Sequence, residues 1–143
     1  MQIGVAEFLL KVSKLKKTEE KVNALKANDS FVLRVVLQGA FDPKVQWALP
    51  PGTPPYKPSE LVDQEHQLIK NAEKIRYFVK GFYDNLPPVK RERMFVELLE
   101  TLAPADAELL CAIKDKKLPF KGITINHVKE ALPGLIPNEQ VQA

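Results

Sequence analysis

Few residues of this chain are placed for metal binding or nucleophilic chemistry. The two histidines, His66 and His127, are far apart in the sequence, and Cys111 is the only cysteine. A structural zinc site needs about four nitrogen or sulfur ligands, which this set does not supply. Asp63 and Glu65 stand near His66, but on a helix these spacings separate the side chains, so a solvated face is favoured. No Gly-x-Ser-x-Gly elbow and no Walker phosphate loop occurs. We expect no metal, no cofactor and no enzymatic activity.

Residues 121–126 have the composition of a phosphate contact. Backbone N–H groups at a helix N-terminus bind phosphate with help from the helix dipole. Lys121 adds charge, Gly122 lets the backbone approach a ligand, and Thr124 can cap the helix or contact a phosphate, with Asn126 following. The alternative interpretation is a glycine that ends one helix and an ordinary cap that begins the next.

A second basic segment, residues 89–93, follows Pro87-Pro88. Lys90, Arg91 and Arg93 would lie at a helix start, where cations oppose the helix dipole. A bound phosphate would compensate for this, and so would plain solvation of long side chains. Two further groups of lysines concentrate positive charge: Lys11, Lys14, Lys16 and Lys17, and Lys114, Lys116, Lys117 and Lys121. A solvated helix face is an equally good account of each group.

The segment Leu118–Pro137, read with the expected helix before it, resembles the end of the N-terminal DNA-binding domain of ATP-dependent DNA ligases, most closely the T-even phage type. The similar features are a helix ending in a basic turn, a glycine, a short helix and the strip Pro-Gly-Leu-Ile-Pro. Residues 28–36 and 41–43 are also similar to early segments of that domain. The Lys-x-Asp-Gly signature of the ligase nucleophile is absent.

This resemblance implies a phage-encoded, non-catalytic accessory protein that grips the backbone of double-stranded DNA without sequence preference. It places Lys121, Gly122, Thr124 and Asn126 near the DNA. Long-range attraction is expected from the remaining basic candidates, Lys116, Lys117, Lys90, Arg91 and Arg93. A fold alone does not fix a function, so a second hypothesis is a helical protein-interaction module that binds a phage or host protein. Its mark would be an exposed apolar patch around Trp47 and the prolines that follow it.

The elements that must position these residues are predicted to be helices. Apolar residues recur at helical spacing through most of the chain, as in Val5, Phe8, Leu9 and Val12. Helices are expected over residues 1–12, from Thr18 to the break at residues 28–30, over 31–40, from Asp42 past Trp47, from Ser59 to about Gly81, from Pro87, over 104–117, and from Thr124. The segment 31–40 also has strand propensity, but no partner strand is evident.

Residues 49–58 contain five prolines and one glycine. This composition excludes a helix, and it suits either a stiff strap across the helical domain or a ligand for aromatic grooves. The expected fold is therefore one all-α domain over residues 1–143, with seven or eight helices, this strap, and a flexible tail at 138–143.

Composition supports a soluble intracellular protein. The chain has 143 residues, of which 45% are hydrophobic and 27% charged, with a net charge of +3. No apolar run approaches the roughly 18 residues of a membrane span, and the first residues lack a basic leader. Cys111 lies among Leu109, Leu110 and Ile113, so it is expected to be buried.

Overall fold

The computed structural model describes residues 3–136 and is all-helical over that range. Its eight helices, one of them a 3₁₀ helix named η1, are α1 (Val5–Ser13), α2 (Thr18–Ala27), α3 (Phe31–Phe41), α4 (Gln67–Lys70), η1 (Ala72–Phe78), α5 (Pro88–Thr101), α6 (Pro104–Lys114) and α7 (Ile125–Ala131). The described residues include no strand, only one isolated bridge between Trp47 and Val79. The all-α prediction is confirmed. The expected tail lies outside the described residues.

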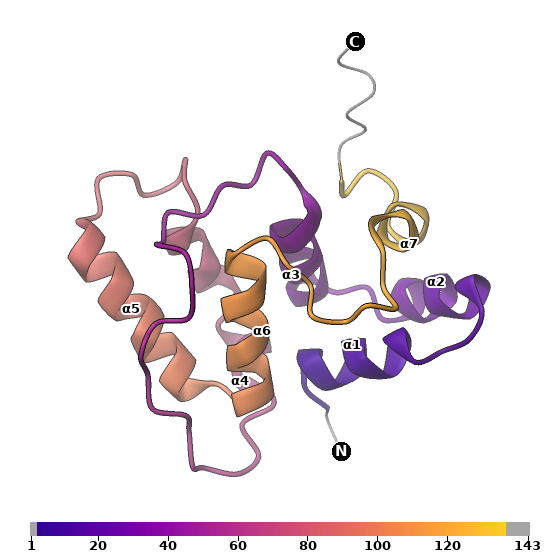
Figure 1. Cartoon of the computed structure of the whole chain (residues 1–143), viewed down its shortest axis with the longest axis horizontal. Helices are drawn as coiled ribbons and strands as arrows, with labels where there is room; N and C mark the ends of the chain where they lie inside the picture. Colours follow the sequence, from indigo (N-terminus) through magenta and orange to yellow (C-terminus); the bar gives the residue numbers. More distant parts are fainter. Residues whose placement is uncertain (1–2, 137–143) are drawn as a thin grey trace.

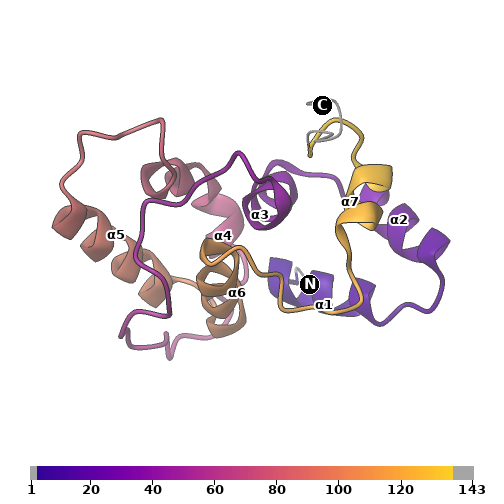
Figure 2. The same cartoon turned by 45° about the horizontal axis from the view of Figure 1, so that its top comes forward.

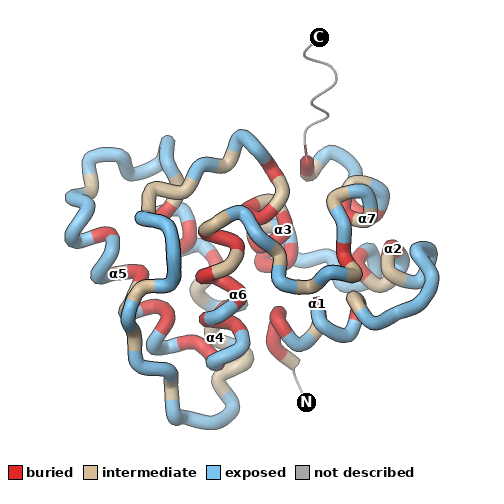
Figure 3. The backbone as a smooth tube through the Cα atoms, in the orientation of Figure 1, coloured by how far each residue is buried: buried red, intermediate tan, exposed pale blue. Residues whose placement is uncertain are grey.

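Four pairs of helices form most of the core. α7 packs on α2, α3 packs on α6, and α1 packs on both α6 and α2. Figures 1 and 2 show α1, α2 and α7 grouped at one end of the molecule and α5 at the other. The inward faces are mostly aliphatic, with Leu9, Leu37 and Leu110 fully buried, and Figure 3 shows the buried positions recurring along each helix. Cys111 is buried on α6 as predicted, and this burial raises the pKa of its thiol.

Helix starts follow the expected capping chemistry in three places. The Ser30 hydroxyl accepts a hydrogen bond from the Leu33 N–H at the start of α3, and prolines open α5 and α6. The segment 31–40 is helical, as predicted, so burial of its apolar face outweighs the strand propensity of its valines. α2 begins at Thr18, as predicted. Lys17 is the cap, and its N–H donates to the Glu20 carboxylate at 3.2 Å.

The proline segment 49–58 is a strap, laid across α5 and α6 (Figure 1). The buried Lys114 ammonium donates to the Pro50 carbonyl at 2.8 Å, and the Gly52 N–H donates to the Asp115 carboxylate at 3.1 Å. The Lys57 N–H donates to Glu100 at 2.9 Å. Lys114 also forms an ion pair with Asp115, with its Nζ 2.8 Å from Oδ1. Lys114 and Asp115, at the end of α6, therefore have a structural role: they hold the strap.

Two expected helices are wrong. Residues 42–48 form a turn, because the Asp42 carboxylate accepts the Lys44 N–H at 2.9 Å and redirects the chain after α3. The long helix expected from Ser59 is reduced to α4 and η1. Residues 59–66 are irregular and include Asp63 at φ 59°, a left-handed conformation that interrupts a helix.

No described helix is long and apolar enough to cross a membrane.

Candidate functional site: an apolar groove beside committed basic residues

Lys116 lies two residues after the end of α6, and all three hydrogens of its ammonium are donated to backbone carbonyls of the fold. Its Nζ donates to the carbonyl oxygens of Gly39 at 2.9 Å, Asp42 at 2.6 Å and Val45 at 3.1 Å. An ammonium has three hydrogens, so this geometry leaves none for a phosphate. Burial lowers the pKa of Lys116, and the Asp42 carboxylate opposes that shift. The structure therefore corrects the expectation that Lys116 is a free cation. Its neighbour Lys117 is exposed.

Arg91 is also structural. Only 7% of this residue is exposed, and its guanidinium donates to the carbonyls of Tyr77 at 3.1 Å and Tyr83 at 3.0 Å. These carbonyls stabilise the positive charge of Arg91 against the unfavourable dipole at the start of α5. A bound phosphate is therefore not needed to explain why a cation stands there. Lys90 and Arg93 are exposed on the same helix.

Gly122 and Thr124 also have internal partners. A Cβ atom at Gly122 would overlap the Ser13 carbonyl, so glycine is required by packing against α1 and not by a ligand. The Gly122 carbonyl accepts a hydrogen bond from Lys21 Nζ at 2.6 Å. Thr124 caps α7 through the His127 N–H at 3.4 Å, and Asn126 is exposed in the first turn. Gly122 was expected to let the backbone come close to a ligand, but the group that comes close to it is the Ser13 carbonyl of α1.

The packing of Gly122 on Ser13 also brings together lysines that are far apart in the sequence. With Gly122 on Ser13, Lys121 comes beside the turn between α1 and α2. We name Lys14, Lys16, Lys17 and Lys121 the lysine cluster; all four residues are exposed. The basic residues of α5 do not share this face. Figures 1 and 2 place the start of α5 at the far end of the molecule from the α1–α2 turn.

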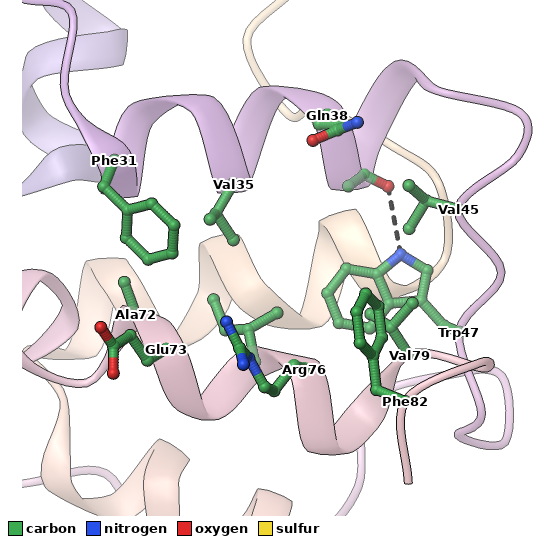
Figure 4. Close-up of a pocket in the computed structure, with 12 residues that line it drawn as sticks. Phe31, Val35, Gln38, Val45, Trp47, Ala72, Glu73, Arg76, Val79 and Phe82 are labelled. Carbon is green, nitrogen blue, oxygen red and sulfur yellow. Dashed lines mark hydrogen bonds between the residues drawn. The ribbon is translucent and has the colours of Figure 1, made fainter. Parts of the chain in front are cut away.

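An apolar groove of about 240 Å³ lies between α3 and η1. Phe31, Val35 and Gln38 line it from α3 at positions i, i+4 and i+7, which is one face of a helix. The opposite wall comes from η1 and the chain after it. The other lining residues are Gly39, Val45, Trp47, Ala72, Glu73, Ile75, Arg76, Val79 and Phe82. We name this feature the α3–η1 groove (Figure 4).

Trp47 closes one end of the groove. Its indole N–H donates to the Gly39 carbonyl at 3.1 Å, the contact drawn in Figure 4. A Cβ at Gly39 would stand 2.8 Å from the indole Cζ2, so glycine there makes room for the ring. The Ala48 N–H donates to the Phe78 carbonyl at 2.7 Å, and the Lys80 N–H donates to the Gln46 carbonyl at 2.8 Å. These two bonds hold the Trp47 segment against the end of η1.

Two aromatic rings stand exposed at the rims. Phe31 is 55% exposed and Phe82 is 62% exposed. In Figure 4 Phe31 hangs from α3 at one end of the groove, and Phe82 stands beside Trp47 at the other. Large exposed aromatics around an apolar hollow are typical of interaction sites. Neither phenylalanine was singled out from the sequence, because nothing in local spacing shows that α3 and η1 are neighbours.

The groove has few polar side chains, and one of them, Gln38, donates to the Asp42 carboxylate at 3.2 Å. Glu73 lies near the Phe31 end and Arg76 lies farther along η1 (Figure 4). The Arg76 guanidinium carbon is 6.0 Å from the centre of the Phe82 ring. Within residues 3–136, neither Glu73 nor Arg76 forms an ion pair. Within the same range no group of three histidine, cysteine, aspartate or glutamate side chains is placed to hold a metal ion.

Residues 8–119 match a family described as a family of unknown function (DUF6433). No curated protein and no solved structure matches the chain.

Proposed function

The chain belongs to the DUF6433 family, whose function is unknown, and we propose that it is a helical protein-interaction module that docks a partner in the α3–η1 groove. The observation that carries the proposal is the groove itself, an apolar hollow with an exposed phenylalanine at each end. Burial of such rings gives a large part of the binding energy at protein interfaces. The proposal replaces DNA as the principal ligand because Lys116 and Arg91 donate to backbone carbonyls and Gly122 packs on α1.

Site-specific photo-crosslinking in cells of the natural source tests this function. A benzophenone amino acid replaces Phe82, Phe31 or, as a matched control, Leu61, which is 71% exposed and does not line the groove. We expect the same protein to be crosslinked from positions 82 and 31 and not from position 61. Equal crosslinking from all three positions, or none from the groove positions, would contradict the proposal.

A second candidate function, duplex DNA binding, is favoured by the lysine cluster. Exposed lysines that converge from two distant segments can attract phosphates without sequence preference. Affinity by this route is about micromolar or weaker at physiological salt and falls steeply as salt rises. The test is an anisotropy titration with labelled duplex at two salt concentrations. Replacing Lys14, Lys16, Lys17 and Lys121 by alanine should flatten the salt dependence by up to about four units, while alanines at Lys90 and Arg93 should not. No binding at low salt would exclude this candidate.

A further inference from the structure

We infer that the occupant of the α3–η1 groove is an amphipathic helix of a partner protein, with an acidic residue at the end of its apolar face that lies beside Arg76. This inference rests on the proposed function and deepens it. Three features of the groove carry it: the nature of its walls, its length and the positions of its charges.

The walls favour a helix over an extended peptide. α3 presents the side chains of Phe31, Val35 and Gln38 and the backbone of Gly39. The Gly39 carbonyl already accepts the Trp47 indole N–H, so it is not free for a ligand. An extended segment would therefore find no free sheet edge along this wall, and its own backbone groups would lose water without gaining partners. A helix satisfies its backbone internally and packs its ridges into the groove between two helices. The exposed rings of Phe31 and Phe82 would then pack against its two ends.

The length of the groove sets the length of the contact. From Phe31 to Gln38 the α3 wall advances by seven residues, which is about 10 Å, or about two turns. Trp47, held on the Gly39 carbonyl, closes one end. A helix of about two to three turns therefore spans the groove, and its apolar residues, spaced three and four apart, insert their side chains into the hollow of about 240 Å³.

The charges place one acid at one end of the occupant. Arg76 has no ion-pair partner in residues 3–136, and its guanidinium carbon lies over the Phe82 ring, 6.0 Å from the ring centre. A guanidinium held by an aromatic ring keeps its donors available for a carboxylate. Glu73, at the Phe31 end, would repel a second acid there. The occupant is therefore acidic beside Arg76 and neutral or basic beside Glu73.

Selection from two displayed peptide libraries tests the inference. Both present peptides of about 16 residues; one is alanine-based and helical, and the other carries a central proline that breaks a helix. Clones selected on the native protein are then measured against three variants, Phe82→Ser, Arg76→Glu and the control Leu61→Ser. Phe82, Arg76 and Leu61 are exposed, so each variant is expected to keep the fold, which circular dichroism checks.

The inference predicts helical clones that carry an acid at one end of an apolar face. Their affinity should fall about tenfold or more with Phe82→Ser and with Arg76→Glu, and should not change with Leu61→Ser. Changing the acid of a clone to lysine should restore binding to Arg76→Glu. Groove-dependent clones that ignore Arg76, or that come from the proline library, would overturn the inference and leave groove docking intact. If no clone from either library is sensitive to Phe82→Ser, both the inference and the proposed function fail.

Discussion

Replacement of Lys116 by methionine should destabilise the fold, although the residue looks like a surface cation in the sequence. Methionine keeps an unbranched stem of similar length and removes the ammonium. That ammonium donates to three carbonyl oxygens, at 2.9, 2.6 and 3.1 Å, and joins the end of α6 to the turn after α3. The change therefore separates a structural role for Lys116 from a role in phosphate binding.

The size of the stability loss depends on which hydrogen-bond donors each of the three carbonyls keeps in Lys116→Met. A hydrogen bond to a charged group contributes about 1.5–3 kcal/mol net. The Gly39 carbonyl keeps the Trp47 indole donor at 3.1 Å, and the Asp42 carbonyl keeps the Val45 N–H at 3.1 Å. Only the Val45 carbonyl loses its sole side-chain donor, and water can reach this carbonyl because Val45 is only partly buried. We therefore expect the loss of about one such bond, roughly 2 kcal/mol, and not of three.

Urea unfolding followed by circular dichroism measures this effect. A loss of about 2 kcal/mol lowers the urea midpoint by about 1 M for a domain of this size. Lys117→Met is the matched control, because Lys117 is exposed and adjacent, and it should change stability by less than about 0.5 kcal/mol. Lys116→Gly should be less damaging than Lys116→Met by about 1 kcal/mol, since φ is 63° at this position. Equal midpoints for Lys116→Met and Lys117→Met would refute the structural role.

Two further substitutions and one labelling reaction test other parts of the fold. Gly122→Ala should cost about 3 kcal/mol in urea unfolding, because its Cβ would overlap the Ser13 carbonyl; native stability in this variant would contradict that packing. Burial raises the pKa of Asp106 more than the Ala6 N–H lowers it, with smaller upward contributions from nearby acids. The folded state therefore holds this proton more tightly, so native stability should decline relative to Asp106→Asn as pH rises through the raised pKa, and a constant difference between the two from about pH 4 to 7 would contradict this. Cys111, buried and with a raised pKa, should react slowly with a thiol reagent in the native protein and quickly in denaturant.

The sequence predicted the helices where apolar spacing and capping agree. The helix over 31–40 and those opened by Pro88 and Pro104 formed as expected, because each combines a buried face with a start signal. Prediction failed where one polar side chain decides the path of the chain. Asp42 turns the chain through its bond to the Lys44 N–H, although Asp-Pro also reads as a helix start.

The candidate site was less accessible to sequence reasoning because its residues meet only in the folded chain. Trp47 was recognised as a marker of an apolar patch, and it lines the groove, but the prolines after it pack on α5 and α6. Phe31 and Phe82 become neighbours of one groove only when η1 packs on α3. The roles of Lys116 and Arg91 were hidden for the same reason, since their carbonyl partners lie in other segments.

The single tryptophan offers the most direct test of docking in the α3–η1 groove. The chain contains one tryptophan, so a ¹H–¹⁵N spectrum contains one indole N–H signal, that of Trp47, whose donor atom lies in the groove wall. The protein is titrated with an acid-bearing helical peptide selected as above. We predict a saturable shift of the indole signal, with the same affinity as the displayed peptide, and no such shift in Phe82→Ser. Saturable binding that leaves the indole signal unmoved would contradict docking in the groove.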